Sequence, residues 1–584
     1  MYLFDTLHIA ASAMNTNQLG MQVVGQNLTN ASTTGYVRET LNVQTNGSRK
    51  TGNGITIGTG SQVTGITQVI DKFLEERLRN SISDSTSSAT QEKYYSELES
   101  LLNELTDYDL STSIETFFNS IDNIQNYPEN VTYRQMAIEQ GLKLTQDINR
   151  ISTEIINIQR EINSAISNAA DDINKLLTEI NGLNKSIALY ESGGANNSSD
   201  AIGLRDQRLS ALTKLSEYIN IKTIENPTNG SVAIYCGSDI LLMDGVQNEL
   251  LVRKQYENSD SIYYAEICIK NTMTPLDVRS GNVAGLYEAN KEILGNFNNE
   301  LDNFAAGLIS EFNKIYSSGQ GMTGYANLKS LVAFDQPNQA ISVDPNLNQP
   351  ISNGGFYLQL YDPKTATTTD YYIPVEVSQG SQIDPFSLKK SIPVAGTSIN
   401  DIASAINAIN GVNASVNSFG ELEISTGNSG LEFAFAGDTS GVLSAIGINT
   451  FFTGNSAQSI GINSTVLNDP TKFAASQNGV GHDVDNSVLL SAMSVKSLTG
   501  LGGRSVIDFY DGIVSEVMLS AATMKSIAST DSLYQASIQA QRDSISGVNI
   551  EEETILMMTY QRAFQANSKL VSIIDEMMQT LIEL

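Results

Sequence analysis

The chain has 584 residues, of which 40% are hydrophobic and only 17% are charged, and its formal net charge at pH 7 is −30. A chain of this length is expected to form roughly three to five domains, because a domain usually holds about 100–200 residues. The strong negative charge repels phosphate groups, so we expect no nucleic-acid partner. Since no apolar run approaches the ~20 residues that a transmembrane helix needs, we also expect no membrane insertion.

The first residues lack the pattern of a secretory signal peptide. Residues 1–13 contain no Lys or Arg, and the first basic side chain of the chain is Arg38. A cleaved signal peptide begins with a positively charged segment and continues into an unbroken apolar one. We therefore expect that any export of this protein proceeds without a cleaved signal peptide.

Apolar residues recur along the N-terminal segment at alternating steps of four and three. This seam consists of Leu3, Leu7, Ala10, Met14, Asn17, Met21, Val24 and Leu28. The spacing predicts a helix that packs in a coiled coil, and a single polar seam position such as Asn17 can fix the register of the pairing. Gly35 predicts the end of the segment, because glycine readily ends a helix.

A second seam of the same kind occupies the C-terminal segment. It consists of Leu556, Tyr560, Ala563, Asn567, Leu570, Ile574, Met577, Leu581 and Leu584. Two such seams at opposite ends of one chain predict an intramolecular coiled coil, and the alternative is two separate amphipathic helices on a globular core. Further apolar residues beside the seams, including Phe4, Phe564 and Val571, widen the face, so we expect neighbouring copies to cover the remainder. The seam residues other than Ala10 and Leu584 form the predicted assembly interface.

The middle of the chain alternates between helical and strand-rich regions. A long helix is predicted for residues 129–192, and shorter helices are predicted for residues 70–105, 283–316, 487–498 and 506–547. The seam of the long helix is Ile148, Ile151, Ile155, Ile158, Ile162, Ala165, Ala169, Ile173, Leu176, Ile180, Leu183, Ile187 and Tyr190. Residues 219–278 and 328–466 are rich in strand and turn signals.

These patterns predict a multidomain α+β chain with a terminal coiled coil, a long-helix stalk and β-rich outer domains inserted in the middle of the chain. The expected domains are 1–50 with 545–584 for the coiled coil, 51–205 with 279–327 and 467–544 for the stalk, and 206–278 and 328–466 for the two β-rich insertions.

The sequence contains no recognisable catalytic or metal-binding constellation. Its two histidines, His8 and His482, lie outside any nucleophile or metal motif. The glycine-rich segment 500–503 lacks the lysine of a phosphate-binding loop, so it predicts a turn between helices. Three acidic residues, Asp469, Asp483 and Asp485, miss the spacing of a calcium loop and are interpreted as loop and cap residues. We therefore assign no catalytic, cofactor or metal residue and expect no enzyme activity.

The chain has two cysteines, Cys236 and Cys268, and both lie in predicted strands. Two cysteines do not form a disulfide framework, and neither has the neighbours of a zinc site. The sequence leaves open whether the two cysteines form a single disulfide.

The two ends of the chain resemble the bacterial flagellar rod, hook and hook-associated protein family. The N-terminal resemblance lies in GQNLTNASTTGY at residues 25–36, and the C-terminal one in GVNIEEE at 547–553 and YQRAFQAN at 560–567. The long helices and NDPTKFAAS at residues 468–476 look like those of the members that form the junction between hook and filament. Residues 401–425, with Ile406-Asn407 and GVNA at 411–414, are similar to the IN motif of flagellins and filament-cap proteins.

The resemblance implies a structural subunit of the bacterial flagellum at the hook–filament junction, needed for filament assembly. The alternatives are a hook or rod subunit or, from a different class, a secreted adhesin or enzyme carried on flagellar-type ends. The implied location is extracellular, reached through the flagellar type III export channel. The implied partners are copies of the same chain in a ring, the hook protein, a second junction protein (hook-associated protein 3), and an export chaperone at the C-terminal helix.

Overall fold

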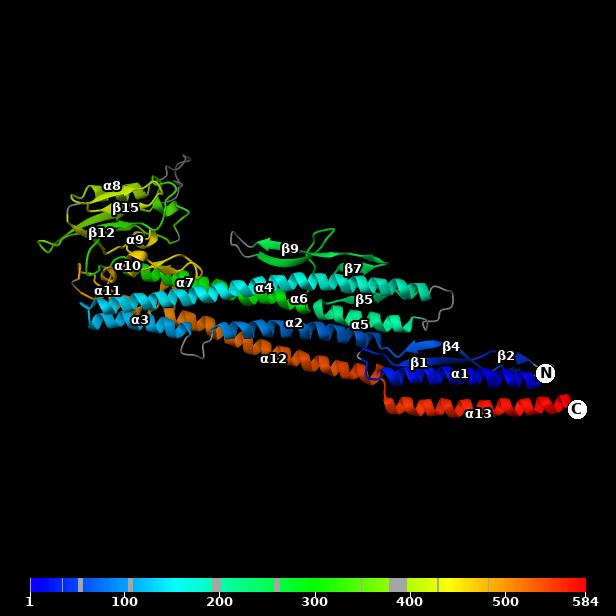
Figure 1. Ribbon diagram of the computed structural model, residues 1–584. Helices are drawn as coiled ribbons and strands as arrows, with labels where there is room; N and C mark the ends of the chain where they lie inside the picture. The colour runs from blue at the N-terminus through cyan, green and yellow to red at the C-terminus, as the bar shows by residue number, and fades with distance from the viewer. Residues whose placement is uncertain are drawn as a thin grey trace, which may run out of the picture. The chain divides into compact units, whose positions relative to one another are not determined.

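The computed structural model describes residues 2–583 except 34, 51–55, 103–108, 192–200, 257–262, 348, 378–395, 428–429 and 482 (Figure 1). Its α-helices are α1 (Tyr2–Asn30), α2 (Lys72–Leu102), α3 (Leu110–Asn126), α4 (Val131–Glu191), α5 (Ile202–Tyr218), α6 (Asn282–Glu288), α7 (Leu294–Tyr316), α8 (Ile399–Asn407), α9 (Val442–Ala445), α10 (Ser464–Asn468), α11 (Asp485–Ala492), α12 (Val506–Ser546) and α13 (Ile550–Glu583).

The strands are mostly short and pair in antiparallel ladders. They are β1 (Glu39–Thr45), β2 (Ser48–Lys50), β3 (Thr56–Gly58), β4 (Ser61–Gln68), β5 (Lys222–Glu225), β6 (Val232–Cys236), β7 (Asp239–Met243), β8 (Val246–Gln247), β9 (Leu250–Tyr256), β10 (Tyr263–Ile269), β11 (Asn327–Lys329), β12 (Gly354–Asp362), β13 (Thr367–Val375), β14 (Asn413–Val416), β15 (Leu422–Ser425), β16 (Glu432–Ala436), β17 (Phe452–Thr453) and β18 (Gly461–Ile462).

The chain divides into two compact units. The first comprises Met1–Tyr94, Arg160–Lys291 and Ala522–Leu584, and the second comprises Tyr95–Gln159 and Glu292–Ala521. The mixed α+β architecture predicted from the sequence is confirmed, and the finer division into four domains stays a prediction. No helix among the described residues is long and apolar enough to cross a membrane.

The predicted long helix is present as α4, with 61 residues, but its buried stripe differs from the predicted seam. Ile166, Leu177 and Asn184 are buried, whereas their predicted neighbours Leu176 and Leu183 are only half-buried and Tyr190 is exposed. An α-helix turns once in 3.6 residues, so a stripe drifts away from a strict seven-residue repeat. The predicted helix over residues 283–316 is interrupted by a π-helical turn at Ala289–Ile293.

Asparagines on α4 attach this helix to the strands of the first unit. Asn184 donates from Nδ2 to the carbonyl oxygen of Val232 at 2.8 Å and accepts from the Val232 amide at 3.1 Å. Asn163 pairs in the same way with the Tyr263 carbonyl and the Ala265 amide, at 2.7 and 2.8 Å. A primary amide carries the donor and acceptor of a peptide group, so each side chain extends a strand ladder onto the helix.

Asn174 makes a third joint of this kind with both backbone groups of Leu250, at 2.8 and 2.9 Å. The joints hold β6, β9 and β10 against one face of α4. The predicted strand-rich region 219–278 therefore consists of strands that are fastened to a helix as well as to one another.

Three elements of the fold were not predicted. The β1–β4 hairpin pairs residues 39–45 with residues 61–68, near the place where the sequence analysis puts the change from coiled coil to stalk. Its strands are largely half-buried or exposed and give only a weak alternation. Helices α3 and α5, of 17 residues each, were also not predicted.

The second unit has an aromatic core. Phe117 of α3, Phe312 of α7 and Phe451 lie with ring centroids 5.2–5.7 Å apart, and all three side chains are fully buried. Gly141 of α4 allows this approach, because an added Cβ would lie 2.8 Å from the Phe451 ring. Such offset and tilted aromatic contacts stabilise a core beyond simple burial.

The β-rich excursion of the second unit, residues 321–475, begins and ends side by side. Gln320 and Ser476 exchange two backbone hydrogen bonds, at 2.8 and 3.0 Å. Beyond this bridge, α8 packs against strands of the sheets β13-β12-β16 and β11-β15-β14 around a common apolar core. Asn407 pairs with both backbone groups of Ala414, which explains why the IN segment needs an asparagine at this position.

We predict that Asn184→Leu weakens the attachment of β6 to α4. The change leaves the buried amide and carbonyl of Val232 without partners, at a cost on the order of 3 kcal/mol. Hydrogen–deuterium exchange of the β6 amides should accelerate by roughly 100-fold. The matched control is Asn168→Leu on the exposed face of the same helix. Equal protection of β6 in the two variants would contradict the role of the asparagine joints.

Candidate assembly interface

The two ends of the chain pack against each other as an antiparallel helix pair (Figure 1). Asn27 of α1 contacts Glu553 near the start of α13, and the Tyr560 ring lies against Gly20 one to two turns further along. Because residue numbers fall along α1 as they rise along α13, the two helices run in opposite directions. An added Cβ at Gly20 would lie 2.7 Å from the Tyr560 ring, so this glycine permits close packing.

The buried stripe of α13 agrees with the predicted seam at Tyr560, Asn567 and Ile574. Between these positions it lies one residue further along the helix than predicted. Glu553 and Ile574 are buried, and a half-buried stripe connects them through Met557, Tyr560, Phe564, Asn567, Val571 and Met578. Four predicted seam residues are instead exposed, namely Leu556, Leu570, Met577 and Leu581. The pattern of the sequence is ambiguous here, because apolar residues occupy both candidate stripes.

The seam of α1 is closer to the prediction. Ala10 and Val24 are buried, and Leu3, Leu7, Met14, Asn17, Met21 and Leu28 are half-buried. The helix is also covered by the β1–β4 hairpin, where the Thr16 and Ser61 hydroxyls lie 3.2 Å apart. The seam asparagine Asn567 donates to the Ala563 carbonyl of its own helix at 2.9 Å, so it does not need a partner on α1.

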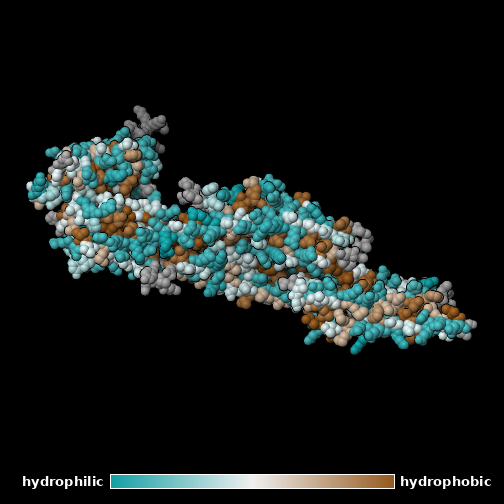
Figure 2. Space-filling model, viewed as in Figure 1, coloured by the Kyte–Doolittle hydropathy of each residue, from teal (hydrophilic) through white to brown (hydrophobic). Residues whose placement is uncertain are grey.

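One face of α13 stays open and apolar. Leu581 is 67% exposed, Met577 53% and Leu570 38%, and all three lie on α13. Figure 2 shows hydrophobic atoms at the surface of the terminal helices. Contiguous exposed apolar surface of this kind marks a protein-interaction site.

A hydrogen-bonded asparagine joins the start of α13 to the end of α1. The Asn27 amide nitrogen donates to Glu553 Oε2 at 3.0 Å and to the Glu39 carbonyl at 2.9 Å. Its Oδ1 accepts from the Glu39 amide at 3.0 Å and from the Tyr36 hydroxyl at 2.9 Å. The buried amide therefore uses its full hydrogen-bonding capacity.

Two ion pairs join further residues of the first unit. Arg38 Nε lies 2.7 Å from Glu553 Oε1, and Arg542 Nε of α12 lies 2.9 Å from Glu75 Oε1 of α2. Arg542 also donates to the carbonyl oxygen of Gly35 at 3.4 Å, and Gly35 has a φ of +82°. None of these charged residues was predicted as functional. Asn27 and Glu553 lie inside the two terminal signatures, whereas Glu75 and Arg542 carry no local sequence signal.

A carboxyl group with an unusual pKa lies beside this network. Burial and then the negative charge of Glu39 raise the pKa of Asp206 on α5 to about 7. The positive charge of Arg542 and a hydrogen bond from Gln68 act in the opposite direction but are weaker. Asp206 thus takes up a proton near neutral pH, which an ordinary carboxyl does not.

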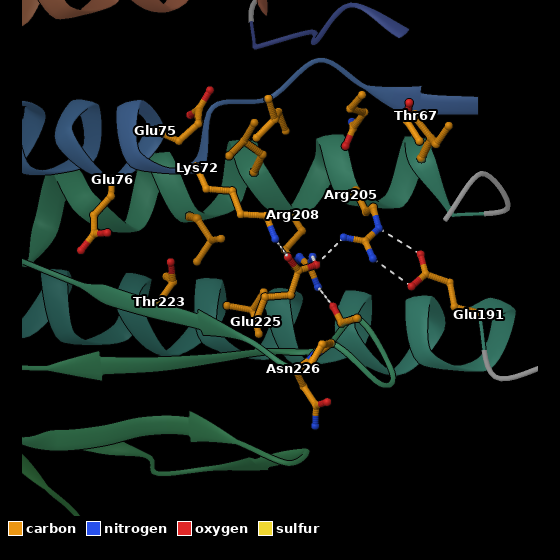
Figure 3. A pocket seen from close by; sticks show the side chains of 18 of the residues that line it. Thr67, Lys72, Glu75, Glu76, Glu191, Arg205, Arg208, Thr223, Glu225 and Asn226 are labelled. Carbon is orange, nitrogen blue, oxygen red and sulfur yellow. Dashed lines mark hydrogen bonds and ion pairs between the residues drawn. The ribbon is translucent and has the colours of Figure 1, made fainter. Parts of the chain in front are cut away.

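A pocket of about 600 Å³ opens between α2, α5, β5 and β6 (Figure 3). Arg205 forms ion pairs with Glu191, at 2.8 Å, and with Glu225. Glu225 also forms an ion pair with Lys72. Arg208 donates to the Gly230 carbonyl at 2.6 Å. The chain's own groups satisfy these three cations, and the ion pair between Arg205 and Glu225 fastens α5 to β5.

The other residues singled out in the sequence lie apart from the helix pair or have local roles. Cys236 and Cys268 are both buried and free of a disulfide. His8 is exposed on α1, and His482 lies outside the described residues. Asp469 caps a 3₁₀ turn and Asp483 accepts from three backbone amides, as expected of loop and cap residues. The described part of the chain contains no cluster of His, Cys, Asp or Glu that could hold a metal ion.

The glycines of α1 provide a matched test of the helix pair. Alanine favours a helix over glycine by about 1 kcal/mol, so Gly25→Ala, whose added Cβ would lie 3.9 Å from the nearest atom, should stabilise α1. Gly20→Ala forces the Tyr560 ring away, and such overpacking costs about 1–3 kcal/mol. Amide exchange in α1 should slow in Gly25→Ala and accelerate in Gly20→Ala. Slower exchange in both variants would mean that α1 and α13 do not pack in this way.

The Asp206 carboxyl predicts a stability that falls as the pH rises. Its folded pKa of about 7 lies above the ordinary value of 3.8, so the folded chain binds the extra proton between these values. Stability is therefore lost from about pH 4 to pH 7 and stays low above it. After allowance for solvent screening, Asp206→Asn should raise the thermal midpoint at pH 8 by roughly 2–4 °C and change it little at pH 4. Asp171→Asn, at an exposed position, is the control. An equal effect of Asp206→Asn at both pH values would contradict this assignment.

Models of three protein families match parts of the chain. "Flagellar hook-associated protein FlgK helical domain" matches residues 95–329, and "Flagellar basal body rod FlgEFG protein C-terminal" matches residues 539–584. "Flagellin hook IN motif" matches residues 391–428, which include Asn407. The C-terminal match contains all of α13.

Relatives match over nearly the full length. Flagellar hook-associated protein 1 of Bacillus subtilis is 23% identical, over 99% of this chain and 98% of the relative. The proteins of the same name from Escherichia coli and Salmonella typhimurium are each 22% identical, over 98% of this chain and 98% and 99% of the relatives.

A solved structure, the flagellar hook junction protein FlgK from Burkholderia pseudomallei, is also similar. It aligns with 15% identity and a TM-score of 0.48, covering 81% of this chain and 100% of that one. The family models and the full-length relatives agree with one another, and over nearly its full length the chain is similar to flagellar hook-associated protein 1.

Proposed function

We propose that the chain forms the junction between hook and filament in the bacterial flagellum, as a structural subunit that acts by packing. The observation that carries this proposal is the helix pair of the two chain ends, with one covered and one open apolar face on α13. An open apolar stripe on an otherwise ordered helix is unfavourable in water unless another surface covers it. Neighbouring copies in a ring would provide that surface.

The hook below the ring and a second junction protein above it are the remaining proposed structural partners. Each subunit would contribute its α1–α13 pair to a continuous helical core, and the β-rich regions would lie outside it. The weakly charged composition supports such close packing, because few charges need to be desolvated at the contacts.

We further propose that an export chaperone covers the open stripe of α13 before assembly. The same apolar side chains, Leu570, Met577 and Leu581, would then serve two partners in succession. Export through the flagellar type III channel, and a location at the hook–filament junction, complete the proposal.

Removal of the gene provides the first test of the junction role. Electron microscopy should show hooks without filaments, and flagellin should accumulate in the medium, since subunits are exported but have no junction on which to assemble. Cells without hooks would move the protein down to the hook or rod. Normal filaments would overturn the proposed function.

Introduction of charges on the open stripe tests the mechanism. Leu570→Asp, Met577→Asp and Leu581→Asp together should leave the α1–α13 pair folded, because all three side chains are exposed in the single chain. Filament number per cell should fall at least tenfold, since three charges would be buried in the ring contact. The control introduces the same three charges at Gln565, Ser572 and Gln579, which are exposed polar positions of the same helix. Equal filament numbers in the two triple variants would contradict assembly through the open stripe.

A further inference from the structure

The Glu75–Arg542 ion pair lies where an apolar contact would be expected. Both side chains are buried, with 5% and 7% of their surface exposed. Leu74 and Leu78 of α2 and Ile538 of α12 form an apolar cluster directly beside the pair. Apolar side chains at these two positions would enlarge that cluster, since Glu75 lies between Leu74 and Leu78 and Arg542 lies one turn after Ile538.

The stability of the contact between α2 and α12 does not by itself explain why a charged pair occupies this place. Two charges lose their hydration when they are buried, and their attraction often only balances that loss. Replacement of a buried ion pair by apolar residues of similar volume is therefore commonly neutral or stabilising, whereas removal of one partner is strongly destabilising. A pair of this kind fixes the relative position of the two helices that carry it, because a planar guanidinium binds its partners in few orientations.

The surrounding contacts connect this ion pair to the two terminal helices. Arg542 holds Glu75 of α2 and the Gly35 carbonyl, which follows α1. One turn further along α12, the Ser546 carbonyl accepts from the Arg38 amide at 2.9 Å. Arg38 in turn holds Glu553, at the start of α13. These polar contacts run without interruption from α2 through the end of α12 to both terminal helices.

We propose that the Glu75–Arg542 pair is a positioning device that fixes the register of α12 on α2 and so sets the direction in which α13 presents its open face. An apolar contact in its place would hold α12 equally firmly but would allow it to slide and rotate. The inference rests on the proposed function only for its consequence, the correct docking of neighbouring copies. The register itself is a property of the single chain.

A double substitution separates positioning from cohesion. Glu75→Leu with Arg542→Met should have a thermal midpoint equal to or higher than that of the unmodified chain, whereas either change alone should lower it. The register is measured with two spin labels, on Asn80→Cys in α2 and Ser568→Cys in α13, while the buried Cys236 and Cys268 stay unlabelled. The distance distribution should be narrow in the otherwise unmodified chain and clearly broader in the double variant.

The outcomes distinguish this inference from the proposed function. A double variant with an unchanged distance distribution, or one that is less stable than either single variant, overturns the positioning role. A broadened distribution together with at least tenfold fewer filaments per cell supports it. A broadened distribution in a chain whose gene removal leaves filaments intact supports the positioning role and overturns the proposed function.

Discussion

The structure depends on the contact between its two ends. Asn27 and Glu553 are 526 residues apart, and their hydrogen bond lies in a buried environment. Closing so long a loop costs conformational entropy, but the cost grows only slowly with loop length. The helix pair offsets it with apolar burial along a close contact that Gly20 makes possible. Everything between residues 31 and 549 can then be regarded as an insertion between two halves of one helical element.

Side-chain amides perform much of the joining that apolar surfaces perform elsewhere. Asn163, Asn174 and Asn184 fasten strands to α4, Asn407 fastens β14 to α8, and Asn27 fastens the terminal helices to β1. An amide carries no charge and needs no counter-ion, and it demands a particular partner geometry. This use of amides is consistent with a chain in which only 17% of residues are charged.

Periodicity predicted the elements that are long and amphipathic. The terminal helices, α4 and the two strand-rich regions follow from spacing alone, because a long repeat averages out local exceptions. The register within the stripes did not follow, since Leu570 and Val571 are both apolar and only packing decides which of them faces α1. The asparagine joints were missed because a polar residue is counted as a gap in an apolar stripe. Arg542 and Glu75 are 467 residues apart in the sequence, and no local pattern predicts a contact between residues so widely separated.

The bridge between Gln320 and Ser476 affects how the sequence of this chain can change among relatives. The start and the end of the excursion meet at this bridge. Apart from the segment around Phe451, which packs in the aromatic core, the length and content of the excursion therefore place little constraint on the rest of the second unit. A domain that leaves and re-enters through a closed neck can be shortened, enlarged or exchanged with little strain on its host. The β-rich segment is therefore the natural place for relatives to diverge in length and for a foreign domain to be displayed on the surface of a flagellum.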